Sequence, residues 1–244
     1  MKEITPSQLA EIIRGSTRAV ALTGAGISVE SGIPDFRSPG GLWSRFDPME
    51  YAAIQAFRAH PAKVWDMLKE MDALLIQARP NPAHLALAAL EAKGMLAGVI
   101  TQNVDNLHQA GGSRNVVEYH GNAHRFVCDT CQGQHPRETL DFELTPLYCL
   151  CGGLIRPDVV FFGEPIPPAA QEVAYGLIFS CDLLLIIGTS GEVAPANFLP
   201  EIAKSRGALI VENNLEPTRL TYPLAQNFLP GSAAKMLPLV LKNL

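Results

Sequence analysis

The sequence predicts an α/β fold, a doubly wound parallel sheet of Rossmann-like type that carries a smaller lobe. Short, unbroken apolar runs at residues 19–23, 97–101, 183–187 and 208–211 have the composition of strands that are buried on both faces. Helical patterns separate these runs, as expected when parallel strands are joined by crossover helices. A glycine-rich turn directly follows the first run, where such folds bind their ligands.

The individual elements are supported by capping and turn residues. Thr5 and Gln8, with Pro6 between them, have the spacing of a capping box with proline at the first helical position. A helical pattern over residues 82–93 is closed by Gly94. A second helix is expected over residues 168–179, and a short strand over residues 116–118.

Two stretches interrupt this alternation and predict inserts in one nucleotide-binding domain. The first begins with prolines and glycines and continues as a helical pattern, and the second contains four paired cysteines. We expect the two inserts to form the smaller lobe together. The predicted division of the single domain 1–244 is a core of residues 1–36, 81–124 and 158–244, a helical insert of residues 37–80 and a zinc insert of residues 125–157.

Composition excludes several classes of protein. With 48% hydrophobic and 18% charged residues, the 244-residue chain is globular rather than disordered. A net charge of −5 gives no electrostatic reason to expect nucleic-acid binding, although basic protein substrates remain compatible with it. The sequence contains neither a membrane-spanning apolar stretch nor a signal-peptide pattern, so a cytoplasmic location is expected. The oligomeric state is not predicted.

Four of the five cysteines form the pattern Cys128-x2-Cys131-x17-Cys149-x-Cys151. Two close pairs at this separation are typical of a zinc ribbon, in which four thiolates complete a tetrahedral shell. A closed shell leaves no position for water, so this zinc is expected to be structural. A redox pair or four unrelated thiols are the alternatives. The fifth, Cys181, lies in an apolar stretch and is expected to be buried.

The glycine-rich turn reads Gly24-Ala25-Gly26-Ile27-Ser28. Glycines after a strand allow the backbone to approach a pyrophosphate, and the N-terminus of a following helix would add N–H donors. Val29 stands where dehydrogenases have their third glycine, which disfavours an ordinary hydride-transfer site. Further along, Asp35-Phe36-Arg37 is compatible with a loop over a nucleotide and equally with a surface ion pair beside a core phenylalanine.

Polar residues follow other predicted strands. The segment Gln102-Asn103-Val104-Asp105 comes after the run that ends at Thr101, at an edge where α/β sheets bind ligands. A capping or turn role for Asn103 or Asp105 competes with ligand binding. The same placement recurs in Gly188-Thr189-Ser190 and in Asn213-Asn214-Leu215-Glu216.

His120 precedes Gly121, between the Asn/Asp segment and the cysteines. A histidine titrates near neutral pH and can act as a general base, although a lone histidine is more often structural. The run Val159-Val160-Phe161-Phe162-Gly163-Glu164 is rich in β-forming residues. It is compatible with plain core or with an edge strand that pairs with an extended peptide.

In order and spacing, these motifs resemble the sirtuins from about residue 7 to the C-terminus. The resemblance implies an enzyme that consumes NAD and removes acyl groups from lysine side chains of a protein or peptide. It implies catalytic roles for His120, Asn103 and Asp105, a structural zinc on Cys128, Cys131, Cys149 and Cys151, and substrate contacts from Val160, Phe161, Gly163 and Glu164. The implied NAD-binding residues are Gly24, Ala25, Gly26, Ile27, Ser28, Asp35, Phe36, Arg37, Gln102, Asn103, Val104, Asp105, His120, Gly188, Thr189, Ser190, Asn214, Leu215, Glu216 and Ala233.

The resemblance also implies the reaction. The acyl oxygen attacks C1′ of the nicotinamide ribose, nicotinamide leaves, and His120 deprotonates a ribose hydroxyl that attacks the resulting imidate. For an acetyl group the products are nicotinamide, O-acetyl-ADP-ribose and free lysine. The alternatives are a mono-ADP-ribosyltransferase that uses the same cleft and a non-catalytic NAD-sensing zinc protein.

Three departures from the family pattern are informative. Family members that prefer succinyl or malonyl groups have a Tyr-x-x-Arg pair where this chain has Leu68 and Met71. Without a cation, acidic acyl chains are expected to bind poorly, and acetyl or longer apolar chains to fit better. Gly191 replaces a usual leucine and Asn213 a usual apolar residue, which affects packing beside the adenosine half of NAD.

Overall fold

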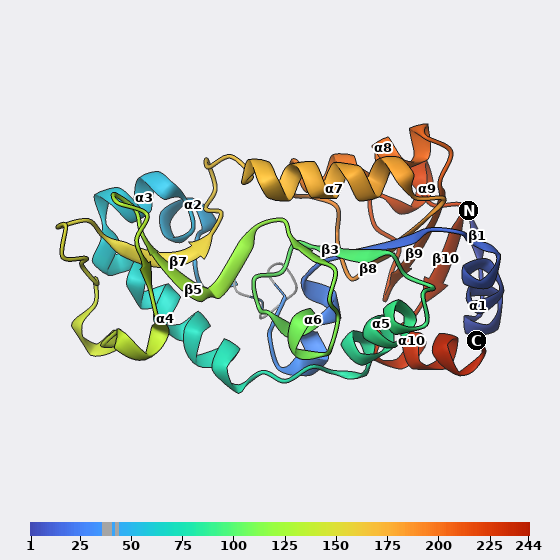
Figure 1. Cartoon of the computed structure of the whole chain (residues 1–244), viewed down its shortest axis with the longest axis horizontal. Coiled ribbons are helices and arrows are strands. Elements are labelled where there is room, and N and C mark those ends of the chain that lie inside the picture. Colours follow the sequence, from blue (N-terminus) through green and yellow to red (C-terminus); the bar gives the residue numbers. More distant parts are fainter. Residues whose placement is uncertain (36–40, 42–43) are drawn as a thin grey trace.

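The computed structural model describes residues 1–35, 41 and 44–244. Its larger sheet has seven parallel strands in the order β1-β10-β9-β8-β2-β3-β4 (Figure 1). The predicted α/β fold class is therefore confirmed. The strands are β1 (Lys2–Glu3), β2 (Ala19–Thr23), β3 (Gly98–Thr101), β4 (Val116–Glu118), β8 (Leu183–Ile187), β9 (Leu209–Asn214) and β10 (Asn227–Pro230).

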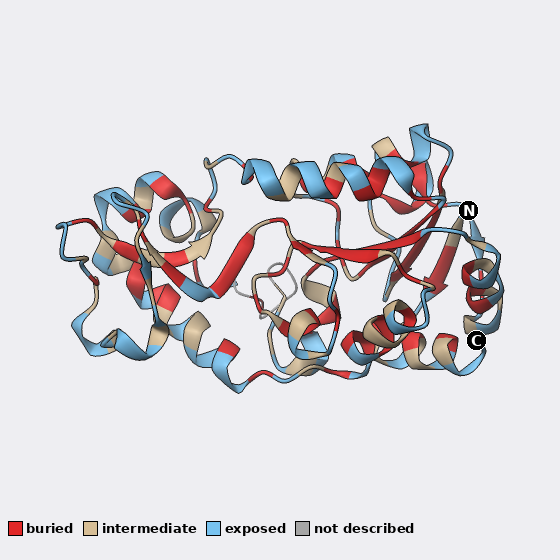
Figure 2. Ribbon diagram, in the orientation of Figure 1, coloured by how far each residue is buried: buried red, intermediate tan, exposed pale blue. Residues whose placement is uncertain are grey.

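Helices cover both faces of this sheet because its strands are apolar on both sides. In β2, Ala19 and Ala21 pack into one core cluster, while Val20 and Leu22 pack into the other. Figure 2 shows the buried strands between two helical layers. The first cluster includes residues of α1 (Pro6–Gly15), α5 (Pro82–Ala92) and α10 (Ala233–Lys242), and the second includes residues of α7 (Pro168–Ser180), α8 (Leu199–Ser205) and α9 (Thr221–Leu224).

The smaller lobe has its own sheet and its own core. Trp65 is fully buried there and stacks on Phe126, with ring centroids 6.5 Å apart. These two residues come from the two predicted inserts, which pack into one apolar cluster. The lobe contains α2 (Pro48–Tyr51), α3 (Ile54–Ala59), α4 (Pro61–Gln77) and the antiparallel strands β6 (Gln134–His135), β5 (Gly121–Cys128) and β7 (Ile155–Val159). The exact insert boundaries stay a prediction.

Most elements lie where the sequence predicts them. The strands at residues 19–23, 116–118 and 183–187 have the expected bounds, and the Thr5–Gln8 capping box is present. Two details differ. The turn at residues 24–28 leads into two short 3-10 turns rather than a helix.

The second difference concerns the β-rich run at residues 159–164. The strand β7 ends at Val159, and beyond it only Phe162 forms a β-bridge, with Ala53.

Among the described residues, no helix has both the length and the apolar character that a membrane span requires. Phe36 and Arg37 lie outside the described residues.

Leu22 gives a test of the packing between the sheet and α7. Its side chain is 1% exposed in a central strand, and we expect Leu22→Ala to lower the free energy of unfolding by about 3–5 kcal/mol because a cavity remains. Urea denaturation followed by circular dichroism measures this change. The matched control is Leu85→Ala on α5, where a side chain that is 53% exposed should change stability by less than about 0.5 kcal/mol. Equal losses in both variants would contradict the assignment of the core.

Candidate active site and metal centre

A cleft of about 890 Å³ opens beyond the carboxyl ends of β2, β3, β8 and β9. It lies at the switch point of the sheet, because the chain proceeds from β2 toward β4 on one side and from β8 toward β10 on the other. The cleft brings together most of the predicted NAD and substrate residues. Those that line it are Gly24, Ala25, Gly26, Asp35, Gln102, Asn103, Val104, His120, Val160, Phe161, Gly163, Glu164, Gly188, Thr189, Ser190, Asn214, Leu215, Glu216 and Ala233.

The loops after β2 and β8 touch at the base of the cleft. Gly26 N–H donates to the Gly188 carbonyl at 2.8 Å. A Cβ atom on Gly26 would lie 2.8 Å from Gly188 Cα, and one on Gly24 would lie 2.7 Å from Thr189 Cβ. The glycines are therefore required by the approach of the two loops, before any ligand is considered. They also leave the backbone of both loops accessible from the cleft.

Behind this wall lies a buried polar cluster centred on Ser28, which is 1% exposed. Ser28 Oγ donates to Asp105 Oδ2 at 2.7 Å and accepts from Asn103 Nδ2 at 3.1 Å. Asp105 also accepts from the Leu107 N–H at 2.9 Å, two residues on, so its alternative role in a turn is real and does not exclude the other, whereas the N-cap of the following helix is Asn106. From this cluster, Asn103 lines the cleft. The neighbouring Ile27 is not part of the cluster and packs in the apolar core of the larger sheet.

Two histidines that the sequence analysis did not single out complete the cluster. His84 Nδ1 accepts from the Asn81 N–H at 3.2 Å, which leaves the proton on Nε2, 3.5 Å from Ser28 Oγ. His108 Nε2 lies 2.9 Å from Thr23 Oγ1, and the two histidine rings are 4.9 Å apart. Burial lowers the pKa of His84 and, together with His84, lowers the pKa of His108 to about 3. Both rings are thus neutral at pH 7.

The signal for His84 was present in the sequence. It stands three residues after Asn81, at the position that closes a capping box, and Glu91 is the other polar residue of this helix. A histidine in that position bonds the cap residue and turns its other nitrogen toward the preceding turn. His108 has no comparable local pattern, because Thr23 is 85 residues away from it in the sequence.

His120 lines the cleft and is held by the backbone of the neighbouring strand. Its Nδ1 donates to the Gln102 carbonyl at 3.1 Å, which leaves Nε2 as the acceptor. Burial lowers the pKa of the imidazole, and the Gln102 hydrogen bond opposes part of that shift. The ring is neutral at pH 7 and has the protonation state that a general base requires.

Hydrogen bonds along another part of the cleft connect residues at the ends of β3, β8 and β9. Gln102 Nε2 donates to Thr189 Oγ1 at 3.0 Å, and Asn214 Nδ2 donates to the Thr189 carbonyl at 3.2 Å. Asn213, which lines this end and is 2% exposed, donates through Nδ2 to the carbonyls of Leu229 and Gly231 at 2.8 and 2.9 Å. The departure at Asn213 therefore ties β9 to β10.

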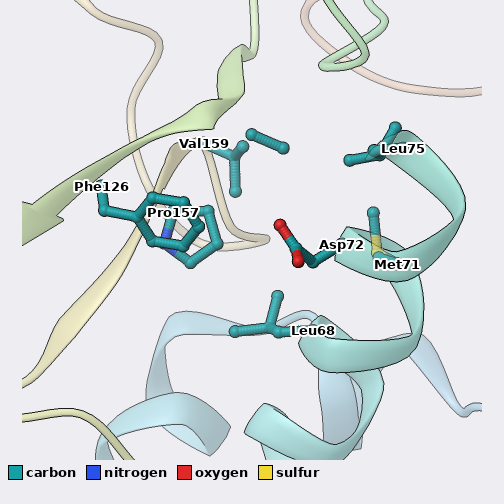
Figure 3. Close-up of a pocket in the computed structure, with 8 residues that line it drawn as sticks. Leu68, Met71, Asp72, Leu75, Phe126, Pro157 and Val159 are labelled. Atoms are coloured by element: carbon teal, nitrogen blue, oxygen red, sulfur yellow. The ribbon is translucent and has the colours of Figure 1, made fainter. Parts of the chain in front are cut away.

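The small lobe closes the cleft with apolar side chains of α4. Leu68 and Met71 line the cleft and also a small cavity behind it, of about 20 Å³. Figure 3 shows these side chains facing Phe126 and Pro157 across that cavity. The one charged group among the cavity residues, Asp72, is paired with Arg137. No cation of the described residues lines this cavity.

The four paired cysteines converge although 17 residues separate the two pairs. All four Sγ atoms lie within 4.8 Å of one another, and the Cys128–Cys151 and Cys131–Cys149 pairs are 3.5 and 3.8 Å apart. Zinc–sulfur bonds of about 2.3 Å place tetrahedral sulfur atoms about 3.8 Å apart. The donor set therefore fits zinc. Cys181 is buried in the core of the larger sheet, and burial raises the pKa of its thiol to about 11.

Comparison with known proteins identifies the family to which this architecture belongs. A Sir2 family model matches residues 24–195, which include the glycine turn, the polar cluster, His120 and all four paired cysteines. The chain belongs to the Sir2 family. Among curated relatives of this Sir2 chain, NAD-dependent protein deacylase 2 of Pyrobaculum aerophilum is 49% identical and covers 94% of this chain and 92% of its own length.

Solved Sir2 structures have the same fold over nearly the whole chain. A complex of a Sir2 homologue with NAD matches with a TM-score of 0.92 and 42% identity, covering 99% of this chain and 95% of that one. A Sir2 variant solved with a deacetylated p53 peptide and 3′-O-acetyl-ADP-ribose matches with a TM-score of 0.92 and 36% identity, covering 98% of each chain.

The cysteine site predicts a metal requirement for folding of the small lobe. We expect about one equivalent of zinc per chain by elemental analysis, and its loss in Cys149→Ser together with a lowered melting temperature, because three ligands hold zinc less tightly than four. Cys181→Ala is the control that should retain the metal, since Cys181 is not among the converging thiols. Unchanged zinc content in Cys149→Ser would argue against this site.

Proposed function

We propose that this chain is an NAD-dependent protein lysine deacylase that acts on acetyl and longer apolar acyl groups. The observation that carries the proposal is the placement of His120. A neutral imidazole, anchored through Nδ1, lines a cleft between strand-end loops of the larger sheet and the apolar face of α4. The cleft thus combines a base, backbone donors and an apolar wall in one space.

In this proposal the strand-end loops bind NAD. The loops at Gly24–Gly26 and Gly188–Ser190 would face the phosphates, because their close contact leaves backbone and hydroxyl groups open to the cleft. Asn214 and Glu216 would hold the adenosine half near Ala233. A Sir2 homologue solved in complex with NAD supports NAD as the ligand of this cleft.

The buried cluster behind the cleft would orient the nicotinamide ribose. When bound, NAD supplies a ribose carbon that becomes electrophilic as nicotinamide leaves, and a developing positive charge there is stabilised by nearby oxygens in a dry site. Asn103 is held by Ser28 and by the Gly24 carbonyl, so its amide is fixed at the cleft wall. Asp105 would act through Ser28. His120 would take the proton from a ribose hydroxyl, with Nε2 as the accepting atom.

The acyl-lysine peptide would lie against the segment 160–164. Among the described residues, the backbone N–H and C=O of Gly163 have no hydrogen-bond partner, so both are available to an extended peptide. A relative solved with a deacetylated peptide supports this class of substrate. The cysteine-bound zinc would hold the small lobe together and take no part in the chemistry, because its four ligands are all from the protein.

The proposal requires that purified protein, NAD and an acetyl-lysine peptide release nicotinamide, which liquid chromatography quantifies. Because His120 is the base, His120→Ala should lower kcat by about 10²–10⁴-fold. His60→Ala is the control, since His60 lies at the start of α4 and outside the cleft-lining set. If the wild-type protein released no nicotinamide with acetyl or longer acyl peptides, the proposal would be wrong. The fate of labelled ADP-ribose, on released acyl groups or on protein, separates deacylation from ADP-ribosyl transfer.

The lowered pKa of His120 predicts the pH profile. The neutral ring is the active form, and a pKa below the ordinary value keeps it neutral to lower pH. We therefore expect the acid limb of kcat/KM to have its midpoint below the ordinary histidine value of about 6.5. An acid limb centred at or above about 7 would contradict the burial of this ring.

Acyl preference should follow the side chains of α4. Acetyl, butanoyl and octanoyl peptides should be turned over, whereas succinyl peptides should react at least about tenfold more slowly, because none of the described residues that line the cleft or the cavity is a lysine or an arginine that could pair with the carboxylate. The double variant Leu68→Tyr with Met71→Arg should raise the succinyl rate. Leu74→Arg, on the exposed part of the same helix, is the control that should not. Equal succinyl and acetyl rates in the wild type would overturn this assignment.

A further inference from the structure

The segment 160–164 that lines the peptide end of the cleft is held by its backbone. Phe162 N–H donates to the Ala52 carbonyl at 2.8 Å, and its C=O accepts from Ile54 N–H at 3.0 Å. Val160 N–H donates to the His120 carbonyl at 2.9 Å. These bonds tie the segment to α3 on one side and to the catalytic histidine on the other. The end of the segment has a backbone hydrogen bond only within the segment itself, from Glu164 N–H to the Phe161 carbonyl at 3.0 Å, so among the described residues its tie to other elements depends on the Glu164 side chain.

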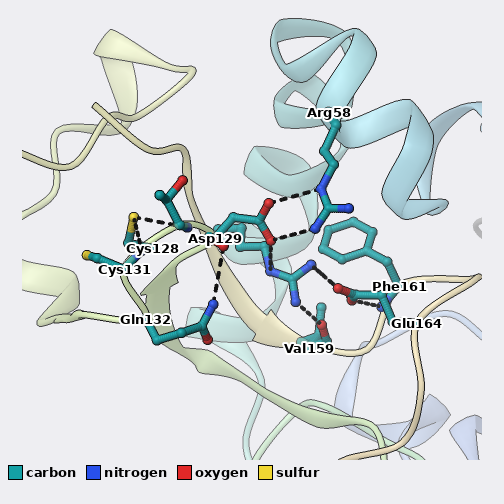
Figure 4. A network of polar contacts seen from close by, with 10 residues as sticks. Arg58, Cys128, Asp129, Cys131, Gln132, Val159, Phe161 and Glu164 are labelled. Atoms are coloured by element: carbon teal, nitrogen blue, oxygen red, sulfur yellow. Dashed lines mark hydrogen bonds and ion pairs between the residues drawn. The ribbon is translucent and has the colours of Figure 1, made fainter. Parts of the chain in front are cut away.

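A chain of alternating charges runs from this segment toward the cysteines (Figure 4). Glu164 accepts from Arg156 Nη1 with both carboxylate oxygens at 2.9 Å and from Phe161 N–H at 2.9 Å. The Arg156 guanidinium lies over the Phe161 ring, 5.0 Å from its centroid, and Nη2 donates to the Val159 carbonyl at 3.4 Å. The carboxylate of Glu164 is thus used inside the protein and turned toward Arg156.

Asp129 continues the chain into the first cysteine pair. Its Oδ1 lies 3.9 Å from Arg156 Nε, and its Oδ2 accepts from Arg58 Nε of α3 at 3.0 Å. Asp129 directly follows Cys128 in the sequence, and the next residue, Thr130, donates its N–H to Cys128 Sγ at 3.4 Å. The turn that carries the thiolate therefore also carries the carboxylate.

The charges in this chain are too buried to be independent. The side chains of Arg156, Glu164 and Asp129 are 11%, 16% and 17% exposed. Together with Arg58 they sum to zero charge, so each ion is compensated only while the others stay in place. Removing one partner from a buried pair leaves an uncompensated charge, which is strongly destabilising locally.

We propose that Arg156 is a positioning residue that couples the zinc-binding turn to the peptide-binding segment 160–164, through Asp129 on one side and Glu164 on the other. In this arrangement Glu164 shapes the segment rather than contacting the substrate. The role in peptide binding rests on the proposed function, whereas the coupling itself is a property of the folded chain.

The coupling is tested in the wild-type protein by hydrogen exchange with mass spectrometry. We expect removal of zinc with a chelator to raise the exchange rate of segment 160–164 at least about tenfold, in addition to that of the cysteine turns, because Asp129 loses its fixed position. In Arg156→Met, exchange of this segment should already be raised with zinc bound, and removal of zinc should add little. Increased exchange confined to the cysteine turns would overturn the proposal.

The consequence for substrate binding is measured with the same variant. Arg156→Met should raise the KM for an acetyl-lysine peptide about tenfold while the Kd for ADP-ribose stays within about twofold of the wild-type value. Arg156→Lys should recover part of the loss, because a lysine keeps the charge but not the fork geometry. The matched control is Arg125→Met, an arginine on β5 whose ion pairs are with Glu118 and Asp158.

The outcomes separate the two proposals. Unchanged peptide KM and unchanged exchange of segment 160–164 in folded Arg156→Met would show that Arg156 does not position this segment. A wild-type protein that releases no nicotinamide would overturn the proposed activity, while the exchange experiment would still decide the coupling.

Discussion

The contact between the loops that follow β2 and β8 is the constraint on which the site depends. Gly26 and Gly188 approach so closely that a Cβ on Gly188 would clash with the Ile27 nitrogen. Because these two strands are neighbours at the switch point, the chain leaves them in opposite directions, and the cleft opens above their junction. Any side chain here would separate the strand ends. The backbone groups of the two loops, the Thr189 hydroxyl and the polar cluster would then no longer be held in fixed positions relative to one another.

The polar cluster and the charge chain are both networks of buried polar groups beside the cleft. Each pairs most of its buried polar groups with one another, although His108 Nδ1 and Arg156 Nε have no hydrogen-bond partner among the described residues, and each contributes to a wall of the cleft. Ser28 uses its hydroxyl fully, with one donated bond and acceptance from Asn103 and His84. Arg156 plays the corresponding part in the small lobe. Leu68 and Met71, on the apolar face of α4, line the same cleft, where the acyl chain would extend.

The sequence predicted what local patterns determine. Buried strands such as residues 183–187 are readable because an apolar run of that length fits little else, and the Thr5 cap is set by neighbouring residues. The strands β1 and β10 were not predicted, because β1 has only two residues, both charged, and β10 begins with an asparagine and ends with a proline, which do not favour strands. The pairing of Arg156 with Glu164 and Asp129 was invisible for a different reason. Ion pairs between segments depend on tertiary packing, and a charged residue in a strand has no local signature of its partner.

His120 occupies the crossing between β4 of the larger sheet and β5 of the small lobe. Its ring donates to the Gln102 carbonyl just after β3, and its backbone carbonyl accepts from Val160 N–H of segment 160–164. His120 therefore connects the end of β3 with a segment that packs on both cores, through Val160 on the larger sheet and through Phe161 in the small lobe. A movement that broke either of these hydrogen bonds would therefore change how the imidazole faces the cleft.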